Sequence, residues 1–240
     1  MSKSRSSACS TNLAMLERPA GAIVRVNESV WLAVRKLRHL LFRLSVGSDS
    51  RVERRLVTMS QQEHHEALTR AVTEKLRNGS TVTIRPMDRS DLELEREFIN
   101  ALSPESRHFR FLGGVGKPSQ KMLEQLTDID HDQREAFIAI VEDDSKEKEV
   151  GVSRYALDAD GKAAECAVVV ADDWQKAGLG TLLINRLIES ARARGISRLY
   201  SIDSAENHKL QEVARNMGWE CHTDPGDATQ VIYSMQLSAG

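Results

Sequence analysis

The stretch AECAVVVADDWQKAGLGTLLINRLIESARARG, residues 164–195, decides the fold. Its first part, AVVVA at 167–171, is apolar enough to form a central strand of a sheet. Its last part repeats apolar residues every three or four positions and ends at Gly195, as an amphipathic helix does. Between the two lies QKAGLG at 175–180, which places two glycines where the helix begins, although glycine is a poor helix former. The glycines therefore predict that something approaches the backbone closely.

A strand that ends in a glycine-bearing turn and leads into a helix makes a site for an anion. Free backbone N–H groups and the positive end of the helix dipole point outward there, and Gly178 and Gly180 would let a phosphate reach them. No Lys-Ser/Thr pair follows the glycines and the spacing is not Gly-x-Gly-x-x-Gly, which excludes the Walker loop and the dinucleotide fingerprint. Close packing of the helix on the strand would also call for glycine, so the motif alone leaves both interpretations open.

Further strands and helices are expected around this stretch. Alternating or continuous apolar runs predict strands, and apolar spacing of three to four residues with Pro or Gly at the ends predicts helices. Strands are expected at 81–86, 136–142, 150–158, 198–203 and 229–237, and helices at 88–100, from Ser103-Pro104 onward, at 120–127, 179–194 and 208–217. This alternation before a terminal hairpin predicts a mixed α/β domain of three layers.

Charge is unevenly distributed along the 240 residues. Residues 1–60 carry eleven Lys and Arg against four Asp and Glu, a net charge of +7, and the whole chain carries −2, which leaves −9 for residues 61–240. This asymmetry indicates two parts with different roles. We expect a basic, partly disordered and helical extension at 1–80, followed by a folded domain at 81–240.

The composition excludes several classes of protein. The three cysteines are far apart and show no disulfide framework or zinc spacing, which favours a reducing, cytoplasmic compartment and no bound metal. No apolar stretch approaches the length needed to span a membrane. The basic N-terminal segment has few aromatic residues to stack on bases, so no nucleic-acid partner is expected.

Two helices are expected before the folded domain. Residues 28–46 place apolar side chains in one stripe and basic side chains on another face. Such a helix binds an anionic membrane surface weakly, docks on its own domain, or associates with a second copy of the chain. Residues 61–77 predict a second helix, ended by an Asn-Gly pair. Its neighbouring His64 and His65 would point about 100° apart, so they cannot readily share a metal.

Several longer phrases match a known family in order and at natural spacing. Beside the opening stretch these are IRPMDRSDLE, LSPESRHFRF, LTDIDHDQREAFIAIV and ENHKLQEVARNMGW. Over about residues 81–238 the chain resembles the GNAT acyltransferases. It resembles most the GNAT domain of bacterial protein-lysine acetyltransferases that modify acyl-CoA synthetases. The resemblance implies an α/β fold with a mixed, mostly antiparallel sheet and helices on both faces.

The resemblance also implies the acyl donor and its site. In this family a Gln/Arg-x-x-Gly-x-Gly/Ala loop cradles the pyrophosphate of coenzyme A, and QKAGLG stands at that place. Acetyl-CoA is therefore the expected donor. The residues expected to bind it are Val168, Val169, Val170, Gln175, Lys176, Ala177, Gly178, Leu179, Gly180, Thr181 and Asn207. Asn207 opens the last helix, where its side chain faces the coenzyme or only caps the helix.

The chain departs from the family pattern at two positions. The family often carries Gly-Lys or Gly-Arg before the first motif glycine, whereas this chain has Lys176-Ala177. The backbone cradle is kept, but the basic side chain is moved by one position. Many GNAT enzymes also place a tyrosine in the last helix as the acid for the leaving thiolate, and Ala214 stands at that position. The protein-lysine branch that this chain resembles also lacks the tyrosine.

Glu165 is the expected general base. A free lysine amine has a pKa near 10.4, so most of it is protonated at neutral pH and a base assists its attack. Glu165 opens the apolar strand, where a carboxylate has a raised pKa, and the similar lysine acetyltransferases carry an acid there. A glutamate at a strand edge that faces solvent is the alternative. Asp172, Asp203 and Glu206 are weaker candidates for the base.

The resemblance predicts an acetyl-CoA-dependent N-acetyltransferase. We expect it to acetylate lysine side chains of proteins by direct attack of the amine on the thioester. One alternative acceptor is a small-molecule amine, because the sequence of such a domain gives little information about the acceptor that it binds. A second alternative is a non-catalytic acyl-CoA sensor, which would keep the glycines but tolerate the loss of Glu165.

Overall fold

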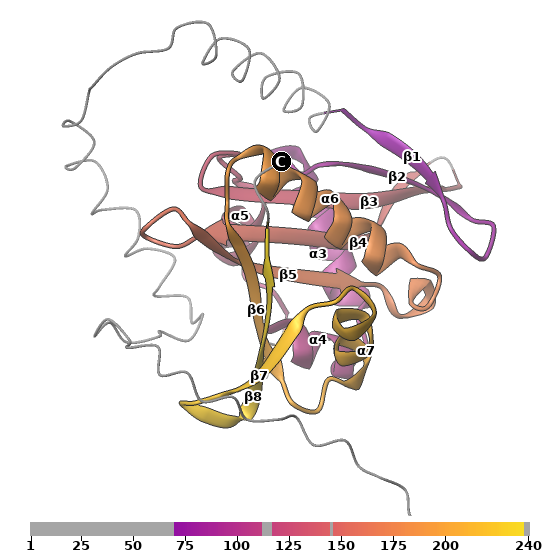
Figure 1. Ribbon diagram of the computed structural model, residues 1–240. Coiled ribbons are helices and arrows are strands. Elements are labelled where there is room, and N and C mark those ends of the chain that lie inside the picture. Colours follow the sequence, from indigo (N-terminus) through magenta and orange to yellow (C-terminus); the bar gives the residue numbers. More distant parts are fainter. Residues whose placement is uncertain (1–69, 112–116, 145, 238–240) are drawn as a thin grey trace, which may run out of the picture. The chain divides into compact units, whose positions relative to one another are not determined.

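One mixed sheet of eight strands forms the centre of the described part of the chain (Figure 1). The structure is a computed structural model that describes residues 70–111, 117–144 and 146–237. In spatial order the strands are β1 (Val72–Lys75), β2 (Thr81–Pro86), β3 (Arg134–Asp143), β4 (Lys146–Leu157), β5 (Ala163–Val170), β6 (Arg198–Ser204), β8 (Asp227–Gln236) and β7 (Glu220–Asp224). Neighbouring strands are antiparallel except β5 and β6, which run parallel. The mostly antiparallel sheet predicted from the sequence is confirmed.

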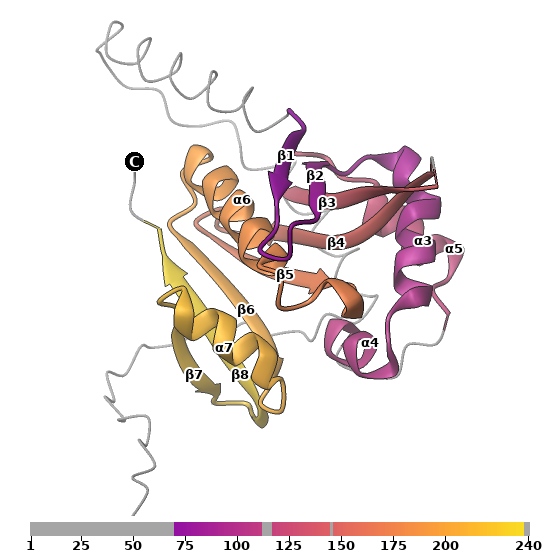
Figure 2. The ribbon, with the colours of Figure 1, turned by 90° about the vertical axis from the view of Figure 1, so that its right-hand side faces the viewer.

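Helices cover both faces of this sheet (Figure 2). They are α3 (Leu92–Ala101), α4 (Pro104–Phe111), α5 (Gln120–Thr127), α6 (Leu179–Ala193) and α7 (His208–Asn216), with 3₁₀ turns η2 (Arg89–Asp91) and η3 (Asp172–Trp174). Helix α6 packs on β3, β4 and β5 from one side, whereas α3 packs on β4 from the other. The three predicted layers are therefore present.

Strand β3 explains why the central strands read as continuous apolar runs. Phe137 and Ala139 point into the hydrophobic cluster under α6, whereas Ile138 and Ile140 point into the cluster formed with α3 and α5. All four side chains are at most 4% exposed. Because both faces of the sheet are covered, successive residues of opposite orientation must all be apolar.

Strands β5 and β6 diverge soon after they begin. The pairing of β5 with β6 covers only Ala163–Glu165 against Arg198–Tyr200, whereas β4 continues to pair with β5 as far as Val170. Figure 1 shows β6 turning away from β5. Beyond Glu165, the backbone of β5 on this side therefore has no partner in β6.

The helix expected at 61–77 is wrong for its last residues, because Val72–Lys75 forms strand β1. This strand pairs antiparallel with β2, from Val72 opposite Ile84 to Lys75 opposite Thr81. The Asn-Gly pair at 78–79, interpreted as the end of a helix, makes the turn of a hairpin instead, which is the other structure this dipeptide favours. Residues 61–69, His64 and His65 among them, and the segment 28–46 lie outside the described residues.

Candidate active site

The loop between β5 and α6 passes through the left-handed region of backbone conformation twice. Lys176 has a φ of 62° and Gly178 a φ of 94°. A residue with a side chain is strained there by about 1–2 kcal/mol, so the backbone itself favours glycine at 178. Ala177 and Leu179 bury their side chains in the cluster under α6, at 7% and 1% exposure. These two residues therefore offer only their backbone to a ligand.

The N-terminus of α6 has no side-chain cap. Gly178 occupies the N-cap position, and no side chain accepts a hydrogen bond from the first turn. In contrast, Ser119 caps α5 and Asn207 caps α7. The first N–H groups of a helix have no partner within it, and they carry the positive end of the helix dipole. This uncapped end of α6 is suited to bind a phosphate group.

Gly180 lies in the first turn of α6, and the protein itself leaves room for a side chain there. A Cβ at this position would meet only Cγ2 of Val170, at the ordinary contact distance of 3.7 Å. Packing within the described residues therefore does not explain this glycine, which leaves open the approach of a ligand to the backbone. The half-buried Thr181 follows in the same turn.

Gln175 ties this loop to β5 and α4. Its Nε2 donates to the carbonyl oxygen of Val170 over 3.2 Å and to Oγ of Ser106 over 3.4 Å. Oγ of Ser106 also donates to Asp172 over 2.7 Å, and the backbone N–H of Ser103 donates to the same carboxylate over 2.9 Å. Gln175 thus holds the loop in place through its side chain.

The same network gives Asp172 a structural role. Burial raises the pKa of its carboxyl group, but the hydrogen bonds from Ser103 and Ser106 outweigh burial and lower the pKa below its ordinary value. A carboxylate that is stabilised in its charged form is a poor proton acceptor. Asp172 is therefore disfavoured as the general base.

Glu165 lies at the point where β5 and β6 diverge. It is half-buried, and it belongs to the last residue pair that joins the two strands. Ala164 points into the cluster under α6, so the side chain of Glu165 lies on the opposite face of the sheet. Burial raises the pKa of Glu165, and the nearby charge of Asp158 raises it further. A raised pKa is suited to a general base.

Asp203 and Asn207 lie on the β6 side of this divergence. Burial raises the pKa of Asp203 to about 6, although Nδ2 of Asn207 and the backbone N–H of Ser204 donate to its Oδ1 over 3.2 and 2.7 Å. Asn207 also caps α7, because its Oδ1 accepts from the N–H of Leu210 over 3.1 Å. The capping role is thus observed for Asn207. Glu206, the third weaker candidate for the base, is exposed.

The valines of β5 direct their side chains into the two hydrophobic clusters. Val168 and Val170 pack toward the cluster under α6, and Val169 packs toward the opposite one. What β5 presents toward the diverging β6 is therefore its main chain. Ala214, at the family's tyrosine position, is 5% exposed and packs against Val231 and Tyr233.

Sequence reasoning missed Arg77. This residue lies in the turn between β1 and β2, and its backbone N–H donates to the carbonyl oxygen of Ala177 over 3.1 Å. The hairpin that carries Arg77 thus contacts the glycine loop, which is about a hundred positions away in the sequence. A local pattern gives no signal for such a contact.

Comparisons with known proteins agree with this geometry. The sequence pattern of the acetyltransferase (GNAT) family matches residues 99–219. The chain is 46% identical to Acetyltransferase PA5475 of Pseudomonas aeruginosa over 164 residues, which is 68% of this chain and 88% of that relative. It is 26% identical to Acetyltransferase Pat of Mycolicibacterium smegmatis over 68% of this chain, and it spans about half of that protein, 48%.

Among solved structures, the GNAT domain of S. lividans PAT superposes with a TM-score of 0.64 at 25% identity. The match covers 70% of this chain and 97% of that domain. The chain therefore belongs to the GNAT acetyltransferase family, and it is an acyl-CoA-dependent N-acyltransferase. Enzymes of this fold use acetyl-CoA as the donor.

The residues of the site fit such a donor. The uncapped α6, the open position at Gly180 and the unpaired edge of β5 offer backbone donors at one place in the fold. No cluster of His, Cys, Asp and Glu suited to a metal ion occurs within residues 70–111, 117–144 and 146–237.

Proposed function

We propose that this protein transfers the acetyl group of acetyl-CoA to lysine side chains of proteins, with Glu165 as the general base. The observation that carries the proposal is the position of Glu165. Its carboxyl group lies where β5 leaves β6, and its pKa is raised by burial and by Asp158. A carboxylate of raised pKa therefore lies beside the part of β5 that does not pair with β6.

The donor is held by backbone groups in this proposal. The first-turn amides of α6, between Gly178 and Thr181, bind the pyrophosphate, and Gln175 fixes the loop that presents them. The backbone of Val168–Val170 binds the pantetheine arm and polarises the acetyl carbonyl. Acetyl-CoA supplies the thioester, whose acyl carbon is the electrophile.

Glu165 accepts a proton from the acceptor. The ionised carboxylate removes a proton from the ammonium or attacking amine of the acceptor, directly or through one water. The amine nitrogen then bonds to the acyl carbon, the carbon–sulfur bond breaks, and the departing thiolate takes up a proton. Asp203, with a pKa of about 6, is the second candidate for the base, because it lies on the β6 side of the same divergence.

The protein-lysine acceptor is supported by the relatives. The chain is similar to Acetyltransferase Pat and to the GNAT domain of PAT, and its motifs resemble those of protein-lysine acetyltransferases. Transfer to a small-molecule amine is the alternative outcome of the test.

Labelled acetyl-CoA distinguishes the acceptors. The purified full-length chain is incubated with the label and either with dialysed cell lysate or with a panel of small amines. Label in protein bands, mapped to lysines by mass spectrometry and absent with the E165Q variant, would support the proposal. Label found only in the small amines would refute the protein-lysine acceptor.

A further inference from the structure

We infer that Arg77 binds the pyrophosphate of coenzyme A from the turn of the β1–β2 hairpin. This inference rests on the proposed binding of coenzyme A at the QKAGLG loop. It assigns a phosphate contact to an element that lies outside the matched family pattern, which covers residues 99–219.

The turn that carries Arg77 is fixed by its own hydrogen bonds. The N–H of Leu76 donates to the carbonyl oxygen of Ser80 over 2.8 Å, and the N–H of Gly79 donates to that of Leu76 over 3.0 Å. Oδ1 of Asn78 accepts from the N–H of Ser80 over 3.1 Å. Leu76, only 4% exposed, anchors the turn in the cluster under α6. The exposed Arg77 is thus held at a defined place.

Arg77 lies directly against the glycine loop. Its N–H binds the carbonyl oxygen of Ala177 over 3.1 Å. A Cβ added at Gly178 would lie 3.5 Å from Nε of Arg77 and 3.7 and 3.8 Å from its Cγ and Cδ. The side chain therefore extends along Gly178, and its guanidinium can reach a phosphate held on the adjacent amides.

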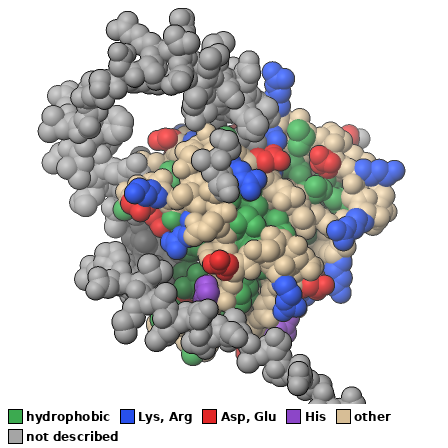
Figure 3. Space-filling view, in the orientation of Figure 1, with side chains coloured by type: hydrophobic (Ala, Val, Ile, Leu, Met, Phe, Trp, Pro, Cys, Tyr) green, Lys and Arg blue, Asp and Glu red, His purple; other side chains and the backbone are tan. Residues whose placement is uncertain are grey.

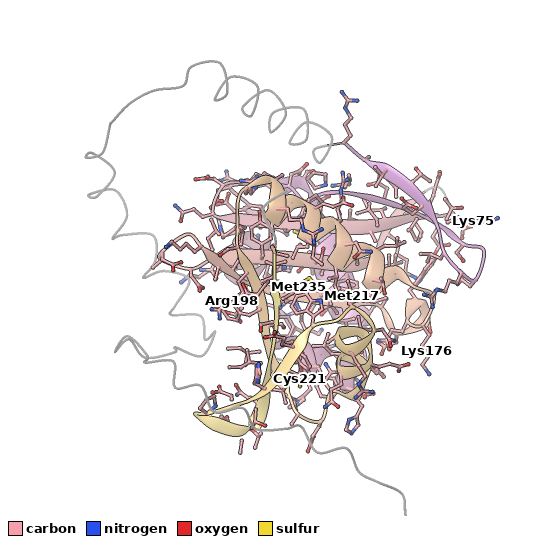
Figure 4. The ribbon with its side chains drawn as sticks, viewed as in Figure 1. Lys75, Lys176, Arg198, Met217, Cys221 and Met235 are labelled. Atoms are coloured by element: carbon pink, nitrogen blue, oxygen red, sulfur yellow. The ribbon has the colours of Figure 1, made fainter. Side chains whose placement is uncertain are left out.

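The charge of Arg77 is available for this role. Within residues 70–111, 117–144 and 146–237, no carboxylate forms an ion pair with it. In Figure 3, Lys and Arg side chains gather on the right-hand side of the domain, where Figure 4 labels Lys75 and Lys176. A basic side chain usual in the family is replaced by Ala177, and Arg77 supplies a positive charge beside the same loop from another element.

Arginine suits a pyrophosphate better than lysine does. Its planar guanidinium presents several N–H donors in a fixed geometry that matches two oxygens of a phosphate. Its contact with an anion outside the core is weakened by water and salt. We therefore expect a moderate, salt-dependent gain in affinity from Arg77 and not an all-or-none requirement.

Calorimetric titration of the full-length chain with coenzyme A and with 3′-dephospho-coenzyme A tests the inference. We expect R77Q to weaken binding of both ligands by about 5- to 30-fold at low salt, toward the low end for a hydrogen bond between charged groups because water screens this exposed contact. R77K should retain more affinity than R77Q, because it keeps the charge. K75Q is the matched control, since it removes the same charge from β1, and it should stay within about twofold of wild type. Thermal unfolding of each variant checks the fold.

The outcomes separate this inference from the proposed function. Unchanged affinity in R77Q, or an equal loss in K75Q, would overturn the role of Arg77 while coenzyme A binding by the wild type still stands. A loss confined to coenzyme A with its 3′-phosphate would overturn the assignment to the pyrophosphate. If R77Q failed to fold, a partial, salt-dependent loss of affinity in folded R77K, with K75Q unchanged, would support the contact of the guanidinium with the phosphate, and R77K affinity equal to that of wild type would oppose it. Absence of binding by the wild-type chain would overturn the proposed function itself.

Discussion

Glu165 lies opposite Tyr200 in the last residue pair that joins β5 to β6. The hydroxyl group of Tyr200 donates to Oδ1 of Asp158 over 2.8 Å, which holds that carboxylate in place beside Glu165. Burial and then the charge of Asp158 raise the pKa of Glu165. One strand pair thus places a carboxylate of raised pKa at the start of the free edge of β5.

Replacement of Glu165 by glutamine should abolish most catalysis and leave donor binding intact. The E165Q side chain keeps the shape but cannot accept a proton, so turnover should fall by about 10²–10⁴-fold. In the wild type, kcat/KM should rise with pH as Glu165 ionises, above the ordinary range of a glutamate because its pKa is raised. The residual activity of E165Q should increase at higher pH, where more of the acceptor amine is neutral. Steady-state kinetics and calorimetry measure the two effects.

Glu206→Gln is the control for this experiment, because Glu206 is exposed on the neighbouring segment. Its turnover should equal that of wild type. Near-normal turnover in E165Q, together with a large loss in D203N, would assign the base to Asp203 instead. Normal turnover in both variants would favour a chain of water molecules as the base.

Asp203 should make the folded state less stable as pH rises. Burial raises its folded-state pKa to about 6, above the ordinary 3.8, so the folded protein binds more protons than the unfolded chain between these values. Its contribution to the free energy of unfolding is therefore most favourable below pH 3.8 and is lost as pH rises through 6. D203N removes this penalty. On going from pH 5 to pH 8, the free energy of unfolding of D203N should therefore rise by about 1–2 kcal/mol relative to that of wild type.

Urea unfolding at several pH values measures this difference. The amide oxygen in D203N still accepts from Ser204 and Asn207, so the fold should be kept. Asp173 is exposed, and D173N is the control that should follow the wild-type pH dependence. A parallel pH dependence in D203N and wild type would contradict the raised pKa.

The two motif glycines should respond to alanine in opposite directions. Gly178 has a φ of 94°, so G178A should destabilise the fold by about 1 kcal/mol. Gly180 is helical with room for a Cβ, so G180A should stabilise the fold by about 0.5–1 kcal/mol. The family motif also allows alanine at this position, so G180A should keep coenzyme A binding, whereas the larger side chain of G180V should abolish most of it by filling the space that the phosphate needs. Denaturant unfolding with calorimetry tests this, and G180V with unchanged affinity would refute close approach at that residue.

The sequence predicted the parts of the fold that local patterns specify. The helix expected at 179–194 is α6, since its buried face repeats at helical spacing and a glycine follows its end. The strand expected from AVVVA is β5. The loop of the candidate site, QKAGLG, could also be predicted from the sequence, because its glycines lie at the junction of a strand and a helix.

The missed features depend on distant contacts. Val72–Lys75 continues a pattern that also fits a helix, and only pairing with β2 makes it a strand. Leu76 then enters the core, and Arg77 meets Ala177. The sequence also could not distinguish Gly178 from Gly180, because the difference between them is one of φ.

The β1–β2 hairpin should mark the true start of the catalytic domain. A chain that begins at Met59 keeps β1, Leu76 and Arg77, and we expect it to fold and to bind coenzyme A like the full-length protein. A chain that begins at Thr81 loses the pairing partner of β2 and the buried Leu76. Removal of one large buried apolar side chain alone costs about 2–5 kcal/mol, so this shorter chain should be markedly less stable.

Thermal unfolding and calorimetry of both truncated chains decide the boundary. Equal stability and equal affinity in the two truncated chains would place the start of the domain at residue 81. They would also show that the hairpin contributes neither to stability nor to coenzyme A binding. If the chain from Met59 itself lost stability, residues before it would contribute to the domain. The expected result is a large loss of stability and a moderate loss of affinity between the two starting points, because the β1–β2 hairpin supplies both a core side chain and a charge beside the glycine loop.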